Sequence, residues 1–441
     1  MLDRTTPPAI QQTAFSFRKP TERILDNGTP LYIIEAEGLD AVRIDFVFSA
    51  GQLHQSRKLQ ALFACRMLRE GCRGYSAAEF AERLDYFGAW LELSVSMGHS
   101  FVTLYTLKKH FAPTIELVQR MLTEPTYSEE QFHTVCANNK ARLLVSLQKG
   151  DVQAMRALRH SIYGAEHPCG MNVTPEDYDT LRVTDAIDFY HRYYGSRTCQ
   201  IYLSGDIDNA LLEHVETLFG REAWGNGERV ESGKMKVKSN LPAGGNNQLP
   251  SNNFQLDTQF ISHPTAVQDS IRMGYLLMDV TDADYLPMRV LTAVLGGYFG
   301  SRLMKNIREK KGYTYHIGSD LVTNTSQALF IVHCEAQVGK AKEIIDEVCR
   351  EMQRLQTEPI TDDELHMVRN YMTGEICRNY ESAFALTDAY IFIHNLGLPT
   401  EHIEHTIEAI RTTDAAHLQQ LAQRYLHPEM LHCVVVSSTN L

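Results

Sequence analysis

The amino-acid sequence predicts an α+β chain of two homologous repeats, each a mostly antiparallel sheet with helices packed on one face, together forming a two-lobed chain. Two sequence motifs recur at nearly the same spacing, which indicates a duplication. Each copy places β-type and helix-type segments in the same order. The 441 residues, 44% apolar and 22% charged, have the composition of a globular protein long enough for several domains.

The first repeated motif is a Glu-Pro pair followed by Ser or Thr, acidic residues and a long helical segment, at residues 124–135 and 358–368. This order is typical of a helix N-terminus. The second motif reads LRVTDA at 181–186 and IRTTDA at 410–415, and a β-rich run follows each copy. The motifs repeat after 234 and 229 positions, so we predict a duplication of about 230 residues.

Other elements follow in matched order. Residues 42–48 alternate apolar and polar side chains, which predicts a half-buried strand, and residues 270–275 are the counterpart. A helix is predicted after each strand, over residues 59–68 and 285–294. Pro113 can begin a third helix that has one apolar side.

A change of composition separates the two copies. Residues 220–253 are rich in Gly, Asn, Ser and Lys and have few apolar groups, which predicts an exposed polar linker. We therefore expect a first repeat over residues 1–219 and a second over residues 254–441.

Charge and composition exclude several classes of protein. The net charge of −12 and the lack of a long Lys/Arg block argue against nucleic-acid binding. No stretch approaches the roughly 18 apolar residues of a membrane span, and the first thirty residues hold no signal-like run. Nine scattered cysteines without a CxxC pair favour free thiols in a reducing compartment, so we expect a cytoplasmic protein without membrane contact.

The most specific motif lies in the second copy. Residues 294–303 read VLGGYFGSRL and residues 307–315 read IREKKGYTY. This pattern is similar to that of the pitrilysin/insulinase (inverzincin) metallopeptidase family, and the resemblance extends over roughly residues 20–438. It implies duplicated α+β domains and zinc-dependent hydrolysis of peptides, with the family's zinc motif H-x-x-E-H on a helix of the first copy.

The zinc motif is degenerate in this chain. The segment MLREG at 67–71 resembles the family's Met-Leu-x-x-Gly, so the five residues before it should be the metal motif. They read LFACR, which places Leu62 and Arg66 at the two His positions and Cys65 at the position of the base. The third ligand is expected near residues 140–146, where no carboxylate occurs. We predict that this chain binds no metal or other cofactor and has no catalytic residue of its own.

Two other groups of residues could in principle replace the zinc chemistry. Cys65 could be a nucleophile, but its apolar neighbours favour a buried, inert thiol. His402 and His405 are spaced for a helical metal pair, with His394 upstream, but a solvent-facing polar stretch is the favoured interpretation.

Arg308 and Tyr315 survive in the matched motif. In the resembling family, an Arg and a Tyr at this spacing bind the substrate backbone and the oxyanion that forms at the zinc site of the opposing copy. Arg keeps its charge and a phenol adds a second donor, which suits this role. The alternative is a solvated helix charge and a core aromatic, and the surrounding Gly-Gly and Ser-Arg-Leu residues favour the substrate-binding role.

These features predict a zinc-less, substrate-binding subunit of a two-chain zinc endopeptidase, resembling one subunit of members such as the mitochondrial processing peptidase. Its partner would be a zinc-bearing homologue, which would hold the zinc, and its substrates would be peptides. A pseudo-peptidase that binds or scaffolds as a homodimer is the alternative, and a self-sufficient metallopeptidase is a third possibility that the missing ligands disfavour. The substrate, the partner and the oligomeric state stay open.

Overall fold

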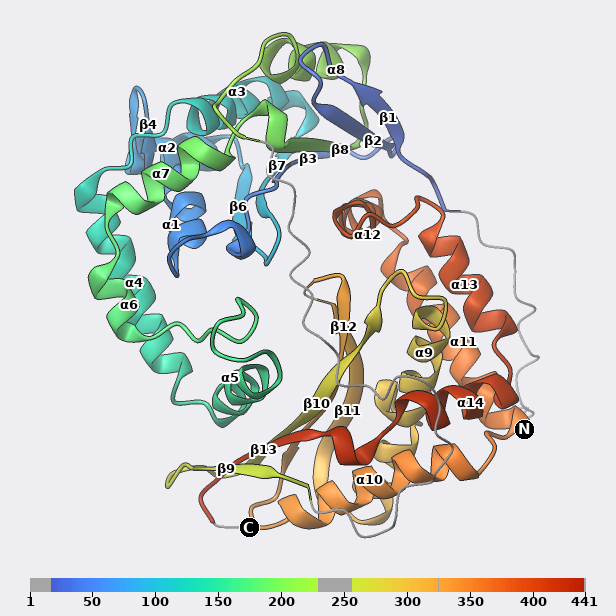
Figure 1. Cartoon of the computed structure of the whole chain (residues 1–441). Coiled ribbons are helices and arrows are strands. Elements are labelled where there is room, and N and C mark those ends of the chain that lie inside the picture. The colour runs from blue at the N-terminus through green and yellow to red at the C-terminus, as the bar shows by residue number, and fades with distance from the viewer. Residues whose placement is uncertain (1–16, 229–255, 324, 440–441) are drawn as a thin grey trace, which may run out of the picture.

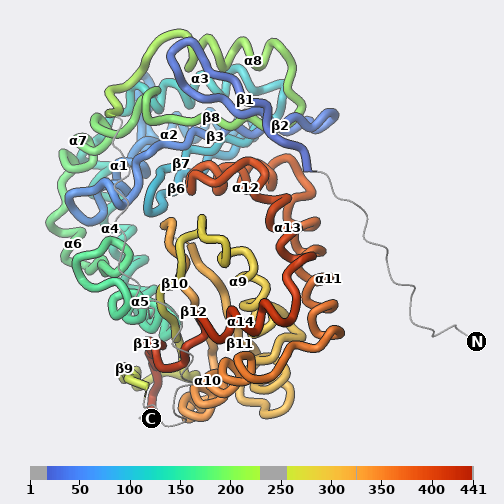
Figure 2. The backbone as a smooth tube through the Cα atoms, turned by 45° about the vertical axis from the view of Figure 1, so that its right-hand side comes forward, coloured from blue at the N-terminus to red at the C-terminus, as the bar shows by residue number. Residues whose placement is uncertain are grey.

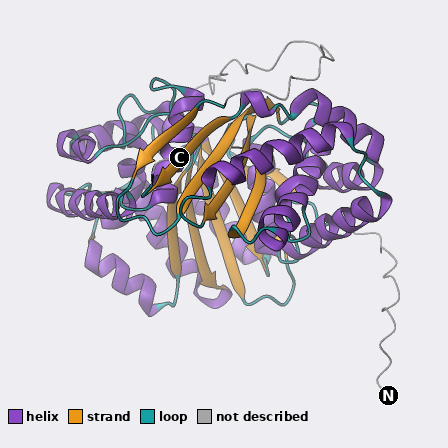
Figure 3. Cartoon of the chain, turned by 90° about the horizontal axis from the view of Figure 1, so that it is seen from below, coloured by secondary structure: helices purple, strands orange, loops and turns teal. Residues whose placement is uncertain are grey.

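The computed structural model describes residues 17–228, 256–323 and 325–439. Two lobes face each other around a common centre (Figures 1 and 2). Seen from below, the strands lie in the middle of the molecule and helices surround them (Figure 3). Among the described residues, no helix has the length and apolar character that a bilayer span requires.

The first lobe contains a six-stranded sheet in the order β1-β2-β8-β3-β7-β6. All neighbours pair antiparallel except β2 and β8, which are parallel. The strands are β1 Thr21–Ile24, β2 Pro30–Glu35, β3 Ala41–Phe48, β6 Trp90–Val95, β7 Ser100–Leu107 and β8 Cys199–Gly205, and a separate hairpin joins β4 Gly71–Cys72 to β5 Tyr75–Ser76.

The second lobe repeats this plan with five strands in the order β11-β12-β10-β13-β9, again with one parallel pair, β13 and β9. The strands are β9 Thr258–Ser262, β10 Asp269–Asp279, β11 Thr314–Thr323, β12 Gln327–Ala336 and β13 His432–Ser437. Because β10, β12, β11, β13 and β9 occupy the places of β3, β7, β6, β8 and β2, the predicted duplication and the mostly antiparallel sheets are confirmed.

The helices follow the same duplication. Those of the first lobe's sequence are α1 Gln60–Arg66, α2 Ala77–Tyr86, α3 Phe111–Thr123, α4 Glu129–Ser146, α5 Gly150–Tyr163, α6 Pro175–Thr180, α7 Val183–Tyr193 and α8 Asn209–Val215. Those of the second are α9 Tyr285–Thr292, α10 Ala341–Thr357, α11 Asp362–Asn379, α12 Ala383–Asn395, α13 His402–Thr412 and α14 Ala415–Tyr425.

The repeated Glu-Pro motif opens α4 and α11 as predicted. The hydroxyl of Ser128 accepts from the backbone N–H of Gln131, and that of Thr361 accepts from the N–H of Glu364. The second motif serves the two lobes differently: Asp414 caps α14, whereas Asp185 lies within the first turn of α7 and accepts from the backbone N–H of Arg182.

The two lobes exchange one helix each. Helix α5 belongs to the first lobe by sequence but packs on β10 and β13 of the second sheet (Figure 1). Helix α12 belongs to the second lobe by sequence but packs on β8 and β2 of the first sheet. Apolar contacts hold α5 in its place: Leu158 of α5 lies against Ile331 and Val434. Each lobe's own helices cover one face of its sheet, as predicted, and the opposite face receives a helix from the other lobe.

The start of the predicted linker differs from expectation. Trp224 packs against Phe48 and Phe219, and its indole N–H donates to the carbonyl of Phe219. Gly225 forms a β-bridge with Gly195. Residues 220–228 are therefore attached to the first lobe. The composition of this segment is polar, but the single Trp has enough apolar area to anchor it. The rest of the predicted linker, residues 229–253, lies outside the described residues.

Candidate functional site

Helix α1 carries Leu62, Cys65 and Arg66, the residues that the resemblance assigns to the zinc motif. Leu62 and Arg66 lie one turn apart on α1 and are both half-buried. Leu62 packs against the core of the first lobe. A leucine side chain has no donor atom for a metal, and a guanidinium repels one. The residues at these two positions do not fit a zinc ion.

Cys65 faces the interior of the first lobe. Its side chain is fully buried, and its Sγ lies 3.7 Å from the carbonyl oxygen of Ser94 and 3.9 Å from that of Phe101. Burial raises the pKa of the Cys65 thiol to about 12, so the thiol stays protonated at neutral pH. A protonated thiol inside the core is neither a nucleophile nor a general base.

Helix α4, where the third zinc ligand is expected, has positively charged side chains at that place instead of a carboxylate. Residues 140–146 lie in α4, where Lys140 pairs with Asp179 and Arg142 is exposed. Burial lowers the pKa of Arg66, and the positive charges of Arg142 and Arg69 lower it further. The electrostatics here therefore favour anions over cations.

The structure also shows the surroundings of His402 and His405, the possible helical metal pair. His402 is buried and His405 is exposed, although both belong to α13. The expectation of a solvent-facing stretch is wrong for His402, since α13 turns this residue toward the interior. In the parts of the chain that the structure describes, no group of three or more His, Cys, Asp or Glu side chains could hold a metal ion.

Arg308 lies in a firmly held segment of the second lobe. The helix from Arg302 to Lys310 takes the wide π form over Met304–Lys310, and Gly312 ends it in a left-handed conformation with φ +68°. Arg302 binds Glu364 of α11 through two 3.0 Å contacts. Asn306 donates to Glu347 and Glu351 of α10, each at 2.8 Å. These contacts fix the backbone around Arg308.

The Arg308 side chain takes no part in the contacts with α10 and α11 that hold this segment. Its guanidinium carbon lies 4.4 Å from the ring centroid of Phe299, whose side chain is 61% exposed. Among the described residues, the Arg308 side chain has no hydrogen-bond or ion-pair partner. Its five N–H donors are therefore available to another molecule.

Tyr315 is the extra residue of a β-bulge. In the pairing of β11 with β12, Thr314 faces Ala336 and His316 faces Glu335, so Tyr315 has no partner across the ladder. Its side chain is 88% exposed. A bulge commonly redirects a side chain next to a binding site, and Tyr315 is consequently not the core aromatic of the alternative interpretation. Residues 304–310 and β11 are in contact, but among the described residues no hydrogen bond joins the Arg308 and Tyr315 side chains.

Sequence reasoning missed Phe299. Its signal was present in the Gly-rich loop, where GGYFG places two aromatics between glycines. The glycines allow close approach: a Cβ on Gly296 would lie 2.5 Å from the backbone nitrogen of Ser319, and one on Gly300 would lie 2.7 Å from the Tyr298 ring. The loop therefore folds tightly against β11 and leaves Phe299 outside, beneath Arg308.

Comparisons with known proteins find similarity to sequences of the M16 peptidase type. Residues 180–372 match the model of the peptidase M16 inactive domain. The uncharacterized zinc protease YmxG of Bacillus subtilis (strain 168) is 20% identical over 361 residues, covering 81% of this chain and 83% of that protein. The non-peptidase homolog YmxG of Helicobacter pylori (strain ATCC 700392 / 26695) is 21% identical over 390 residues, covering 86% and 84%.

A solved structure extends the likeness to the whole fold. The crystal structure of a peptidase M16 inactive domain from Pseudomonas fluorescens matches with a TM-score of 0.81 and 18% identity, and the match covers 96% of this chain and 98% of that one. Residues 180–372 therefore match the M16 inactive-domain model, and the chain as a whole is similar in sequence and fold to relatives of the M16 (pitrilysin/insulinase) type.

Proposed function

We propose that this protein is a zinc-less subunit that binds peptide substrate for a zinc-bearing homologous partner. In this role Arg308 and Tyr315 donate hydrogen bonds to a substrate carbonyl and to the oxyanion that forms from it during hydrolysis. The partner holds the zinc and the general base, since Leu62, Cys65 and Arg66 cannot supply them.

The proposal rests on one observation. Local irregularities of the backbone direct the side chains of Arg308 and Tyr315 outward, in a region that ion pairs and hydrogen bonds otherwise hold in place. The π-helical turn carries Arg308 and the β-bulge carries Tyr315. Such irregularities are frequent at functional sites. Donors held in place before the reaction stabilise a developing negative charge without reorganisation.

The relatives' names are compatible with a role other than independent hydrolysis. The Helicobacter pylori relative is named a non-peptidase homolog. Its name describes that protein, and we extend it to this chain because the zinc-motif positions here have lost their donor atoms.

The test is co-expression with a zinc-bearing M16 homologue from the same organism and measurement of peptide cleavage by the pair. We expect the pair to cleave faster than the partner alone. We expect Arg308→Ala to lower kcat by about 10²-fold, the usual effect of losing one oxyanion donor, and Tyr315→Phe to lower it by less. Lys305→Ala is the matched control, because Lys305 is an exposed cation of the same helical segment.

Unchanged cleavage with Arg308→Ala, or no gain over the partner alone, contradicts the proposal. If the purified chain instead forms a homodimer that binds peptide without any partner, and Arg308→Ala leaves that binding intact, the homodimeric scaffold is the better description.

A further inference from the structure

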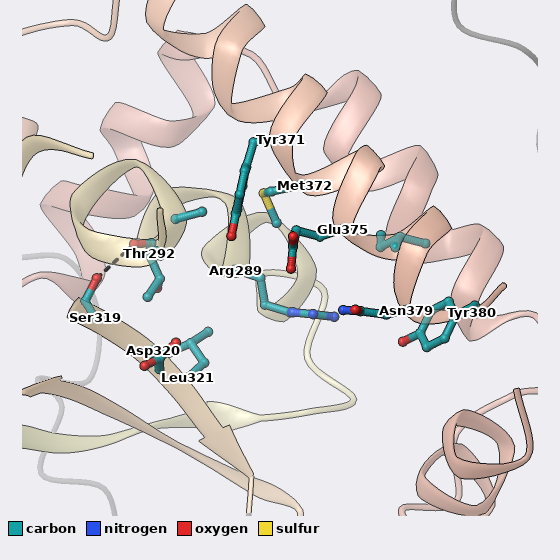
Figure 4. A pocket seen from close by; sticks show the side chains of 13 residues that line it. Arg289, Thr292, Ser319, Asp320, Leu321, Tyr371, Met372, Glu375, Asn379 and Tyr380 are labelled. Atoms are coloured by element: carbon teal, nitrogen blue, oxygen red, sulfur yellow. Dashed lines mark hydrogen bonds between the residues drawn. The ribbon is translucent and has the colours of Figure 1, made fainter. Parts of the chain in front are cut away.

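The second lobe contains a cavity of about 290 Å³ between α9, β11 and α11. This volume is near the lower end of those of small-molecule sites. Leu321, Met372 and Ile376 form an apolar part of the wall, and two tyrosines, Tyr371 and Tyr380, also line it. Figure 4 shows Leu321, Met372 and the two tyrosines around Arg289 of α9.

Arg289 is half-buried and directs its guanidinium across the cavity toward Asn379 (Figure 4). Among the residues that the structure describes, its side chain has no ion-pair or hydrogen-bond partner. It also borders a second, smaller cavity of about 150 Å³, where its charge helps to lower the pKa of His402, an effect that burial dominates. The Arg289 guanidinium thus lies between two cavities without an ion-pair partner among the described residues.

The acidic side chains of the cavity are engaged elsewhere. Glu375 pairs with Arg378, with 2.6 Å between Oε1 and Nη2. Asp320 lies 3.5 Å from Nδ1 of His333. Neither carboxylate is within ion-pair distance of Arg289, yet both add negative potential to the cavity. That potential favours a singly charged anion over a doubly charged phosphate.

We propose that this cavity binds a carboxylate-bearing ligand, with the carboxylate on Arg289 and an apolar group against Leu321 and Met372. The planar fork of an arginine matches the two oxygens of a carboxylate. The carboxylate comes from a free short-chain acid or from the C-terminus of a peptide. The site is separate from Arg308 and Tyr315, so its failure would leave the proposed function standing.

Titration calorimetry on the full chain tests this site with three probes. The first is 4-methylpentanoate, the second is acetyl-Ala-Ala-Leu with a free C-terminus, and the third is the same peptide as its C-terminal amide. We expect at least one carboxylate to bind and the amide to bind at least about tenfold more weakly. Binding of 4-methylpentanoate assigns a free acid, and binding of the acid peptide alone assigns a peptide C-terminus.

Two variants and a control make the test specific. Arg289→Gln removes the cation, and Asn379→Asp places a competing carboxylate beside it, so both should weaken binding at least about tenfold. Arg83→Gln removes an exposed cation of the first lobe and should leave binding unchanged. Equal binding of acid and amide peptides, unchanged binding by Arg289→Gln, or tighter binding of inorganic phosphate than of either carboxylate overturns the proposal.

Discussion

A guanidinium nitrogen of Arg43 in β3 lies 2.5 Å from a carboxylate oxygen of Asp388 in α12, 345 positions later in the chain. Arg43 also binds Asp45 through two 2.9 Å contacts and donates to the carbonyl of Phe384. One buried arginine therefore connects the first sheet to the helix that the second lobe contributes.

The two partners of Arg43 should respond differently to mutation. Asp45 is 1% exposed, so Arg43→Met leaves a buried carboxylate without its cation and should lower the free energy of unfolding by about 3–5 kcal/mol. Asp388 is 66% exposed, and Asp388→Asn should cost no more than about 1 kcal/mol. Urea denaturation of both variants measures the contrast. The double variant Arg43→Met with Asp45→Leu should recover much of the loss, and a double variant as unstable as Arg43→Met contradicts this account.

His402 should make stability depend on pH. Burial lowers its folded-state pKa to about 4, below the value of about 6.5 in the unfolded chain. The unfolded state therefore binds more protons between these values, and the stability present above pH 6.5 is lost as the pH falls toward 4. At pH 5 the loss is on the order of 2 kcal/mol. Urea denaturation at pH 7 and pH 5 should show a smaller loss for His402→Gln than for the unmodified chain, and equal losses contradict the prediction.

Two glycines provide a matched test of packing. A Cβ on Gly296 would lie 2.5 Å from the backbone nitrogen of Ser319, so Gly296→Ala should destabilise the protein by about 1–3 kcal/mol. Gly374 lies within α11 with open space around it, so Gly374→Ala should stabilise it by about 0.5–1 kcal/mol. Thermal unfolding of the two variants should shift in opposite directions. A shift in the same direction would mean that the loop does not approach β11 this closely.

Local signals explain which parts of the fold were predictable. Ser128 and Thr361 cap their helices through residues three positions away, so the duplicated frame can be read from short motifs. The helix exchange depends on contacts between distant segments: a Cβ on Gly150 of α5 would lie 2.8 Å from Oγ of Ser270 in β10. No pattern within α5 specifies that neighbour, because such close approach depends on tertiary packing.

The same distinction applies to the candidate site. Arg308 and Tyr315 are predicted from their motif, but the exposure of Tyr315 follows from the pairing register of β11 and β12, which is a tertiary property. The contact of Arg308 with Phe299 likewise depends on how the glycine loop folds. The lack of metal-donor atoms at Leu62 and Arg66 can be seen in the sequence itself, because metal ligation requires particular side-chain types at fixed spacing.

Thiol reactivity should separate one cysteine from the rest. Eight of the nine cysteines are buried, and Cys377 alone is partly exposed. A thiol reagent applied to the native protein at pH 8 should therefore modify Cys377 first, and all nine should react after unfolding. Mass spectrometry of the labelled peptides identifies the site. Rapid labelling of native Cys65 would contradict its burial and reopen the possibility of a reactive thiol on α1.

Restoring ligands tests the geometry of the lost metal motif. Leu62 and Arg66 lie one turn apart on α1, so Leu62→His with Arg66→His should create a two-histidine face that binds Ni²⁺ measurably by titration calorimetry. Each single variant should bind much more weakly, because one imidazole lacks the chelating partner. Adding Cys65→Glu should not restore hydrolysis and should lower stability by several kcal/mol, since that side chain is fully buried. If the double variant binds no better than either single variant, the two positions do not share a face, and the assignment of residues 62–66 to the zinc motif is wrong.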